Sequence, residues 1–288
     1  MPNCAFLTIE NKEGWFIDDN LVHLPLRSLG WEISDVVWNA NVDWNVFDVV
    51  VIRSPWDYQH DLNKFFTVLQ QIESSSATLF NSLEMVKWNC DKNYLFDLHN
   101  SGVEIVPSLQ VDSLSRKDLR KIFRHFATDE IILKPTIGAN ADDTYRICCD
   151  TEEDELAKIC TTFSRKPCLT QPFMNGIIKE GEFSLMYFNG RLSHSIIKTV
   201  GTDDFRVQEE HGGGVIALPE PESDLVAAAG RAIATLPETP MYARVDMVRT
   251  DANTFALMEL ELIEPCLYFR FGEHSARDFA KAIDNRWR

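Results

Sequence analysis

The sequence lacks long hydrophobic runs and is poor in positive charge. No apolar stretch approaches the roughly 18 residues of a membrane span. The first residues, MPNCAFLTIENKEGW, lack the basic start and apolar core of a signal peptide. Lys and Arg total 28 against 44 Asp and Glu, a net charge of −16. Such an acidic chain argues against binding to nucleic acid or to an anionic membrane. We therefore expect a cytoplasmic protein with neither partner.

Paired cysteines and several familiar site motifs are also missing. The seven cysteines are scattered, odd in number and contain no C-x-x-C pair, which favours reduced thiols over disulfides or a zinc site. There is no G-x-x-x-x-G-K-[ST], G-x-G-x-x-G, H-E-x-x-H or G-x-S-x-G. The remaining candidates for chemistry are carboxylates, strand-borne lysines and two glycine-containing loops.

The 288 residues are enough for about two domains. Apolar strand patterns at 4–9, 31–38 and 47–54 alternate with helical patterns such as 62–75. This alternation predicts an open α/β domain over residues 1–85, with a boundary near 82–92. Beyond it we predict a strand over 103–111 and a hairpin turning at Asn189-Gly190.

The most informative stretch is residues 242–265, which reads as two strands joined by the polar turn TDANT. If Arg249 lies opposite Ala256, Asp246 falls opposite Glu259 and Arg244 opposite Glu261. Two negative charges about 5 Å apart repel by roughly 3 kcal/mol at an effective dielectric of about 20. A magnesium ion shared with phosphates would offset that repulsion. The alternative is a hairpin whose acidic face is simply solvated, but Phe255, Leu257 and Ile263 are expected on that face, which favours a cleft.

Two lysines also stand where an anion would explain them. Lys134 ends the apolar strand pattern IILKP, and the loop 138–144 that follows, beginning with Gly138, has a shape suited to cover phosphates. The alternative is a lysine that snorkels from a strand end. Lys92 lies just inside a helix N-terminus, which is the unfavourable end for a cation.

Further basic and aromatic residues follow strand ends. Arg53 in RSPWDY could hold a substrate carboxylate, with Trp56 and Tyr58 as pocket walls; the alternative is a packed turn with an ion pair. Arg206 precedes three consecutive glycines, including Gly213, in a loop suited to clamp substrate or phosphate. Lys198 ends the hairpin before that loop.

Taken in order, these motifs resemble the ATP-grasp superfamily, in its branch of glutathione synthetases and ribosomal glutamate ligases. RSPWDY and ELELIEP resemble still more closely the ATP-grasp enzymes that close the ring of D-cycloserine. The ordered motifs are DK (91–92), ILKP (132–135), TQPF (170–173), GEFS (181–184), DFR (204–206) with GGG, RVD (244–246) and MELELIEP (258–265).

The resemblance implies a role for each matching position. Lys92 and Lys134 would contact ATP phosphates, and residues 138–144 would form a lid over them. The backbone of Gln171 and Phe173 would meet adenine, and Glu182 the ribose. The remaining implied roles are magnesium binding by Asp246, Glu259 and Glu261, nucleotide binding by Lys198, and contact with the reacting phosphate by Arg206 and Arg244. Many relatives have Asn where this chain has Glu261.

The fold implied is α/β: an N-terminal α/β domain (1–85) on the substrate side, then a two-subdomain ATP-grasp fold (86–288). The lid subdomain would cover about 103–170 and the metal-binding subdomain about 171–288. The activity implied is an ATP- and magnesium-dependent carboxylate–amine ligase or cyclase acting on a small amino-acid-like substrate. A small-molecule kinase on the same fold and a non-catalytic nucleotide-binding module are the alternatives. Dimers are common in this superfamily, so a homodimer is compatible with the sequence.

Overall fold

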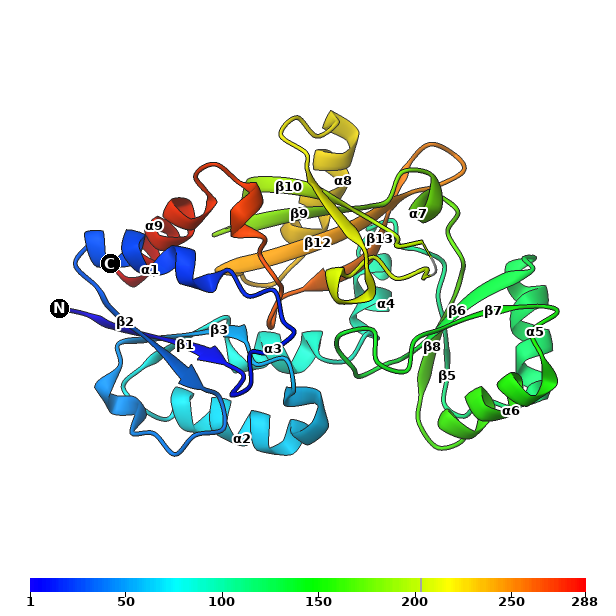
Figure 1. Cartoon of the computed structure of the whole chain (residues 1–288), viewed down its shortest axis with the longest axis horizontal. Coiled ribbons are helices and arrows are strands. Elements are labelled where there is room, and N and C mark those ends of the chain that lie inside the picture. The colour runs from blue at the N-terminus through cyan, green and yellow to red at the C-terminus, as the bar shows by residue number, and fades with distance from the viewer. Residues whose placement is uncertain (203) are drawn as a thin grey trace.

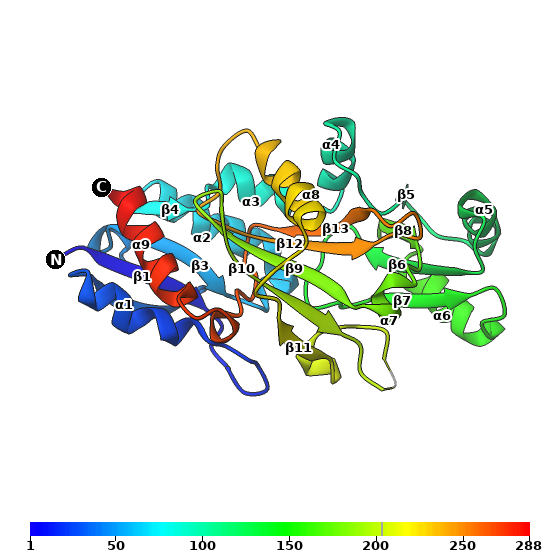
Figure 2. The same ribbon diagram turned by 90° about the horizontal axis from the view of Figure 1, so that it is seen from above.

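Three β-sheets follow one another along the long axis of the molecule (Figure 1). The computed structural model describes residues 1–202 and 204–288. Seen from above, both chain termini lie at one end and helices α5 and α6 at the other (Figure 2). The predicted α/β fold class is confirmed. Over the described residues, every helix is too short or too polar to cross a membrane.

The N-terminal sheet is parallel, with strand order β2-β1-β3-β4, as the alternating pattern predicted. Its strands are β1 (Asn3–Thr8), β2 (Glu32–Val37), β3 (Val49–Ser54) and β4 (Thr78–Phe80). Helix α2 (Leu62–Glu73) packs its apolar side on one face. Helices α1 (His23–Ser28) and α9 (Ser275–Trp287) lie against the other face, so that the end of the chain completes the first domain's core.

The large sheet is antiparallel, with order β11-β10-β9-β12-β13. Its strands are β9 (Glu182–Phe188), β10 (Arg191–Thr199), β11 (Gly214–Ala217), β12 (Tyr242–Arg249) and β13 (Phe255–Glu261). Strands β9 and β10 turn at Asn189-Gly190, as predicted; both residues have positive φ, as a tight turn requires. Helices α4 (Tyr94–Asn100) and α8 (Ser223–Ala234) bury one face of the sheet, which leaves the other face for a cleft.

The small sheet has order β5-β8-β6-β7 and is covered by α5 (Arg116–Phe126) and α6 (Glu153–Thr162). Its strands are β5 (Leu109–Val111), β6 (Glu130–Pro135), β7 (Tyr145–Cys148) and β8 (Cys168–Pro172). The predicted strand over 103–111 is wrong over most of its length. Pro107 has no N–H to donate, and only β5 and a single bridge between Ile105 and Leu257 form.

Short helices join the sheets. The helix α3 (Leu83–Asn89) was not predicted, although Ser82 caps it by accepting a hydrogen bond from the Met85 N–H. The one-turn helix α7 (Gly176–Lys179) leads from β8 into β9.

A β-bulge sets the faces of the hairpin β12–β13. Asp246 pairs with Glu259 and Arg244 with Glu261, as predicted. Arg249 pairs with Phe255, however, and not with Ala256, because the register shifts at Met258. The extra residue shifts the alternation of side chains by one position. Phe255 and Leu257 therefore point into the core against α8, and not onto the face that carries the acids. The prediction that they share that face is wrong.

Two buried asparagines hold this hairpin against the N-terminal part of the chain. Asn81 donates from Nδ2 to the carbonyls of Tyr242 (2.9 Å) and Leu262 (2.8 Å). Asn89 donates to the Leu260 carbonyl (2.8 Å) and accepts from the Leu262 N–H (2.9 Å). These four bonds satisfy backbone groups of Tyr242 on β12, of Leu260 on the edge strand β13 and of Leu262, which follows β13.

Candidate active site

A cleft with a volume of about 230 Å³ lies where the small sheet, the large sheet and the N-terminal domain meet. Most predicted site residues line it, from all three regions. They are Trp56, Tyr58, Lys92, Lys134, Gly138, Gln171, Phe173, Glu182, Lys198, Arg206, Arg244, Glu259 and Glu261. The fold therefore brings together side chains that are far apart in the sequence.

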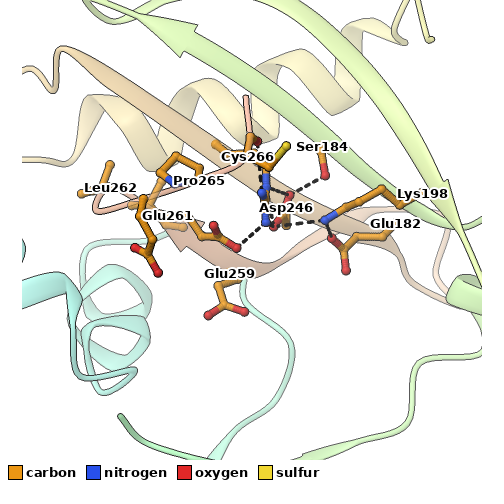
Figure 3. A network of polar contacts seen from close by, with 12 residues as sticks. Glu182, Ser184, Lys198, Asp246, Glu259, Glu261, Leu262, Pro265 and Cys266 are labelled. Carbon is orange, nitrogen blue, oxygen red and sulfur yellow. Dashed lines mark hydrogen bonds and ion pairs between the residues drawn. The ribbon is translucent and has the colours of Figure 1, made fainter. Parts of the chain in front are cut away.

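Asp246 lies beneath the cleft floor, with only 2% of its surface exposed. Arg244 Nη2 donates to its carboxylate at 2.9 Å, Lys198 Nζ lies 3.6 Å away, and the Ser184 hydroxyl donates to it (Figure 3). Burial alone would raise the pKa of Asp246, but Arg244 and Lys198 lower it to about 2. The carboxylate is therefore fully ionised and holds both cations in place.

Glu182 and Lys198 form a second buried pair beside it (Figure 3). Burial raises the pKa of Glu182, although Lys198 opposes the shift. Burial also disfavours the charged lysine, but the carboxylates of Asp246 and Glu182 raise the pKa of Lys198. Because Lys198 is only 2% exposed, it acts on the cleft mainly by fixing Glu182 and Asp246.

Glu259 faces the cleft and is flanked by two lysines. Its carboxylate lies 3.1 Å from Lys92 Nζ and 3.9 Å from Lys134 Nζ. Lys92 also donates to the carbonyl of Gly138 at 2.8 Å. Burial lowers the pKa of Lys134, so this ammonium has much to gain from an anion in the cleft. The two lysines that the sequence singled out thus converge on one carboxylate at the start of the loop 138–144.

Glu261 is held by Arg244 on the other side of the floor. Its side chain is 27% exposed, so the carboxylate remains accessible from the cleft. Burial and neighbouring carboxylates, opposed by Arg244, raise the pKa of Glu261 to about 8. Glu261 pairs with Arg244, whereas Asp246 lies beside both Arg244 and Lys198.

The donor chemistry of this floor fits magnesium, which prefers carboxylate oxygens. In residues 1–202 and 204–288, however, no three His, Cys, Asp or Glu side chains are arranged to hold a metal as they stand. The carboxylates turn instead towards Arg244, Lys92, Lys134 and Lys198, which offset their mutual repulsion. The assignment of Asp246, Glu259 and Glu261 as magnesium ligands stays a prediction.

The predicted adenine and ribose side of the cleft lies along β8. The Gln171 side chain donates to the Ser108 hydroxyl at 2.9 Å. The Phe173 N–H donates to the carbonyl of Glu130 at 3.0 Å, and the guanidinium of Arg146 lies 3.8 Å from the centre of the Phe173 ring. An adenine contact at Phe173 must therefore use a group other than its N–H, unless β6 shifts.

Arg206 and Gly213 differ in their position relative to the cleft. Arg206 lines the cleft, but its guanidinium pairs with Asp204, whose pKa it lowers to about 2. Gly213 does not line the cleft; a Cβ there would collide with the carbonyl of Val207, so close packing explains the glycine. The role of Arg206 at the reacting phosphate and that of Gly213 at the substrate stay predictions.

Arg53 also lies outside the cleft. Its side chain is 1% exposed, forms an ion pair with Asp19 at 2.9 Å and donates to the Pro265 carbonyl at 3.0 Å. It lies 5.3 Å from the centre of the Tyr242 ring. This is the packed turn with an ion pair that the sequence left as an alternative, and this conformation offers no path from Arg53 to a substrate carboxylate. Trp56 and Tyr58, by contrast, form a wall of the cleft.

Known proteins are similar to this chain in both sequence and fold. Residues 4–81 match the family described as the N-terminal domain of D-cycloserine synthetase DcsG. The cycloserine biosynthesis protein DcsG of Streptomyces lavendulae is 29% identical over 281 residues, covering 90% of each chain. A crystal structure of D-cycloserine synthetase DcsG superposes with a TM-score of 0.88 at 25% identity, covering 99% of this chain and 100% of the other.

A structure of the ATP-grasp ligase PsnB, in complex with a precursor variant, Mg and ADP, matches with a TM-score of 0.69. It is 13% identical and covers 99% of this chain and 98% of the other, a likeness of fold alone. The chain is therefore similar to D-cycloserine synthetase in sequence and fold, and to ATP-grasp ligases in fold. The resemblance to the ATP-grasp superfamily, and within it to the D-cycloserine-forming enzymes, is thereby confirmed.

The loop 138–144, the predicted lid, touches the wall of the cleft. Asn140, in the loop 138–144, donates from Nδ2 to the Trp56 carbonyl at 2.9 Å. Gln59 donates to Asp142 at 3.2 Å. Asn140 has a φ of +54°, a left-handed conformation that asparagine tolerates better than most residues. The loop is thus fixed at one end by Lys92 and at its middle by the N-terminal domain.

The sequence analysis missed several residues that line the cleft, and four of them stand out. Trp15, Glu264, Cys266 and Tyr268 all line the cleft. Tyr268 has a φ of +48°, and its ring lies 5.9 Å from the Arg244 guanidinium. Glu264 stands within the ELELIEP motif, and a carboxylate between an isoleucine and a proline at a strand end was a signal that could have identified it.

Proposed function

We propose that this ligase uses ATP and magnesium to activate the carboxyl group of a small amino-acid-like substrate and to form a C–N bond. The observation that carries the proposal is the floor of the cleft, where Lys92 and Lys134 flank Glu259 and Arg244 joins Asp246 to Glu261. Alternating charges of this kind suit a reaction that builds and moves negative charge.

In the first step a substrate carboxylate oxygen attacks the γ-phosphorus of ATP, the bond to the β-phosphate oxygen breaks, and ADP leaves. An amine then attacks the acyl phosphate carbon, phosphate departs and the amine loses a proton to solvent. Lys92 and Lys134 hold phosphate oxygens, while Arg244 neutralises charge on the transferred group. Asp246, Glu259 and Glu261 would hold magnesium, which supplies further charge neutralisation when bound.

The amine of this ligase can belong to a second molecule or to the activated molecule itself. Ring closure within one molecule is supported by the relative from Streptomyces lavendulae, whose name assigns it to cycloserine biosynthesis. The match of residues 4–81 to the N-terminal domain of D-cycloserine synthetase supports it as well, because Trp56 and Tyr58 of that region wall the cleft.

The test is release of ADP and phosphate with a panel of amino acids and their ureido and peptide derivatives. We expect Asp246→Asn and Glu259→Gln to lower turnover by at least about 100-fold, because each removes charge at the reacting group. Asp251→Asn, an exposed change in the turn of the same hairpin, is the matched control and should keep full activity. Full activity in either site variant would overturn the assignment of the floor.

The product separates this proposal from the kinase alternative. Mass spectrometry should find an amide or a ring that has lost water relative to the substrates. A stable phosphorylated substrate would instead identify a kinase. ATP binding without ADP release, with every acid in the panel, would identify a binding module.

A further inference from the structure

Glu264 is a cleft carboxylate to which neither the sequence nor the proposed reaction gives a task. It follows β13 and precedes Pro265, and it lines the cleft beside Trp56 and Tyr58 from the N-terminal domain. Trp15, from the segment after β1, lies on the same wall, with its ring 5.2 Å from that of Trp56. Glu264 therefore faces the aromatic end of the cleft.

Glu264 differs from the other carboxylates of the site in its partners. Glu182, Asp246, Glu259 and Glu261 each have a Lys or Arg nitrogen within 4 Å. Among all residues other than Asp203, no cationic side chain lies that close to Glu264. Lys92 attracts it only from a distance, since its ammonium already pairs with Glu259. Asp142 and Glu210 also line the cleft without such a partner, but both are exposed to solvent, whereas Glu264 is half-buried. The protein thus supplies no close counter-charge to this half-buried carboxylate.

The surroundings hold Glu264 firmly in place. The Trp56 indole N–H donates to the Glu264 carbonyl at 2.9 Å, and Arg53 donates to the carbonyl of Pro265 at 3.0 Å. Asn140 from the lid in turn donates to the Trp56 carbonyl. The carboxylate and its aromatic wall are therefore preorganised, and a bound group would meet a rigid surface.

The chemistry of this surface selects one kind of ligand. Burial raises the pKa of Glu264 to about 7, against the opposing effects of Lys92 and the neighbouring Tyr58 hydroxyl, so the empty cleft disfavours the charged carboxylate. A cation would remove that penalty. One carboxylate beside Trp56 and Tyr58 is a poor site for a hydrated divalent metal, which needs several oxygen ligands. It suits an organic ammonium, which pairs with the carboxylate and gains from nearby aromatic faces.

We propose that Glu264, supported by Tyr58 and the indole wall, binds the ammonium group of the substrate whose carboxyl group the ligase activates. This rests on the proposed function and narrows it. The substrate must then carry a free amino group at its end of the cleft, and simple carboxylic acids or N-acylated amino acids are excluded.

The test uses alanine and serine of both hands as probes, each beside its N-acetyl derivative, with a non-hydrolysable ATP analogue and magnesium present. Calorimetry should show at least one free amino acid binding ten-fold or more tightly than its N-acetyl form. In Glu264→Gln, which keeps the size of the side chain, that preference should fall by ten-fold or more. Tyr58→Phe should reduce it less. Glu264→Asp should recover part of it.

Two further measurements make the result specific to Glu264. The affinity of each variant for the ATP analogue should stay within two-fold of wild type, because the Lys92 ammonium pairs with Glu259 and not with Glu264. The thermal unfolding temperature of Glu264→Gln should be no lower than that of wild type, which shows that the variant is folded.

The outcomes separate the two proposals. If the nucleotide binds but no probe shows the ammonium preference, or if Glu264→Gln keeps it, the assignment of Glu264 is overturned and the ligase proposal stands. If the nucleotide itself does not bind with magnesium, the proposed function has failed first. Loss of the preference in Glu264→Gln with unchanged nucleotide affinity establishes the ammonium site.

Discussion

The N-terminal sheet and the large sheet are both covered by helices, but the first buries mainly apolar side chains and the second also buries charged ones. The first four residues of β3 are aliphatic and fully buried, and polar side chains appear only at its end, with Arg53 and Ser54. Strands β9 to β13 carry buried charges along their length, including Glu182, Lys198 and Asp246. The first sheet is stabilised by apolar burial, whereas the second depends on the matching of charges. Each should therefore respond to its own kind of perturbation.

Removing one buried cation should produce the largest effect on stability. Lys198→Met leaves Glu182 and Asp246 short of a counter-charge, and breaking such a buried pair costs about 3–5 kcal/mol. Urea unfolding measures it. Lys281→Met, at an exposed pair on α9, should cost less than about 0.5 kcal/mol. Equal losses of unfolding free energy in the two variants would mean that the buried ion pairs stabilise the large sheet no more than an exposed pair stabilises α9.

A cavity in the N-terminal sheet should cost slightly less. Ile52→Ala removes apolar atoms from a fully buried position and should lower the free energy of unfolding by about 2–4 kcal/mol. The loss should be the same at low and high salt, because the substitution removes no charge. Ile216→Ala, at a side chain that is 59% exposed, is the control and should change little.

Ligand binding should stabilise the charged sheet in particular. Magnesium and ADP at 100 times their dissociation constant should add about 2.7 kcal/mol to the free energy of unfolding. Lys134→Met should lose most of this gain, since the buried ammonium no longer meets the phosphates. Thermal unfolding with and without EDTA measures both. An unchanged gain in Lys134→Met would remove Lys134 from the nucleotide site.

The pH dependence of stability should report Glu264. Its pKa is about 7 in the fold and 4.5 in the reference state, so between these values the folded protein binds more protons than the unfolded one. Stability of the empty protein should therefore fall as pH rises from 5 to 7, by about 1–2 kcal/mol after allowance for its position beside an open cleft. Glu264→Gln should reduce this slope without abolishing it, because the pKa of Glu261 is also raised, to about 8. The exposed Glu220→Gln should leave the slope unchanged.

The contact between lid and wall should give the smallest effect. Asn140→Gly keeps the left-handed backbone accessible but removes the hydrogen bond to the Trp56 carbonyl, a loss of about 1 kcal/mol or less. Global unfolding should barely change, while proteolytic cleavage within 138–144 should become faster. Unchanged cleavage would mean that Trp56 does not hold the lid.

Much of the site could be predicted because strand periodicity places residues two apart on one face. It correctly put Asp246 opposite Glu259 and Arg244 opposite Glu261. The same periodicity misplaced Phe255 and Leu257, because nothing in the local pattern marks the bulge at Met258. The predicted pairing near the turn is wrong by one residue. The extra residue at the bulge restores the predicted register, so the pairing of the acids is correct.

Residues that act through tertiary contacts were beyond local patterns. Arg53 has the sequence context of a ligand-binding residue, but Asp19 and the Pro265 carbonyl consume its donors, and neither neighbour is near it in the chain. Asn81 and Asn89 bond to backbone groups more than 150 residues away. Glu264 carries a local signal before Pro265, but its lack of a Lys or Arg nitrogen within 4 Å follows only from the fold.

Asn81 and Asn89 also limit where a chimera can join the N-terminal domain of one protein to the remaining domains of another. Residues 4–81 match a family model of their own, and Asn81 is the last residue of that match. A chimera that takes its N-terminal domain from a relative would keep the floor of the cleft aligned only if it retains an amide at 81 and joins the two parents before Asn89 or beyond it with that residue intact. The wall formed by Trp56 and Tyr58 would then be exchanged as a unit, while Glu264 and the floor of the cleft would stay with the second parent.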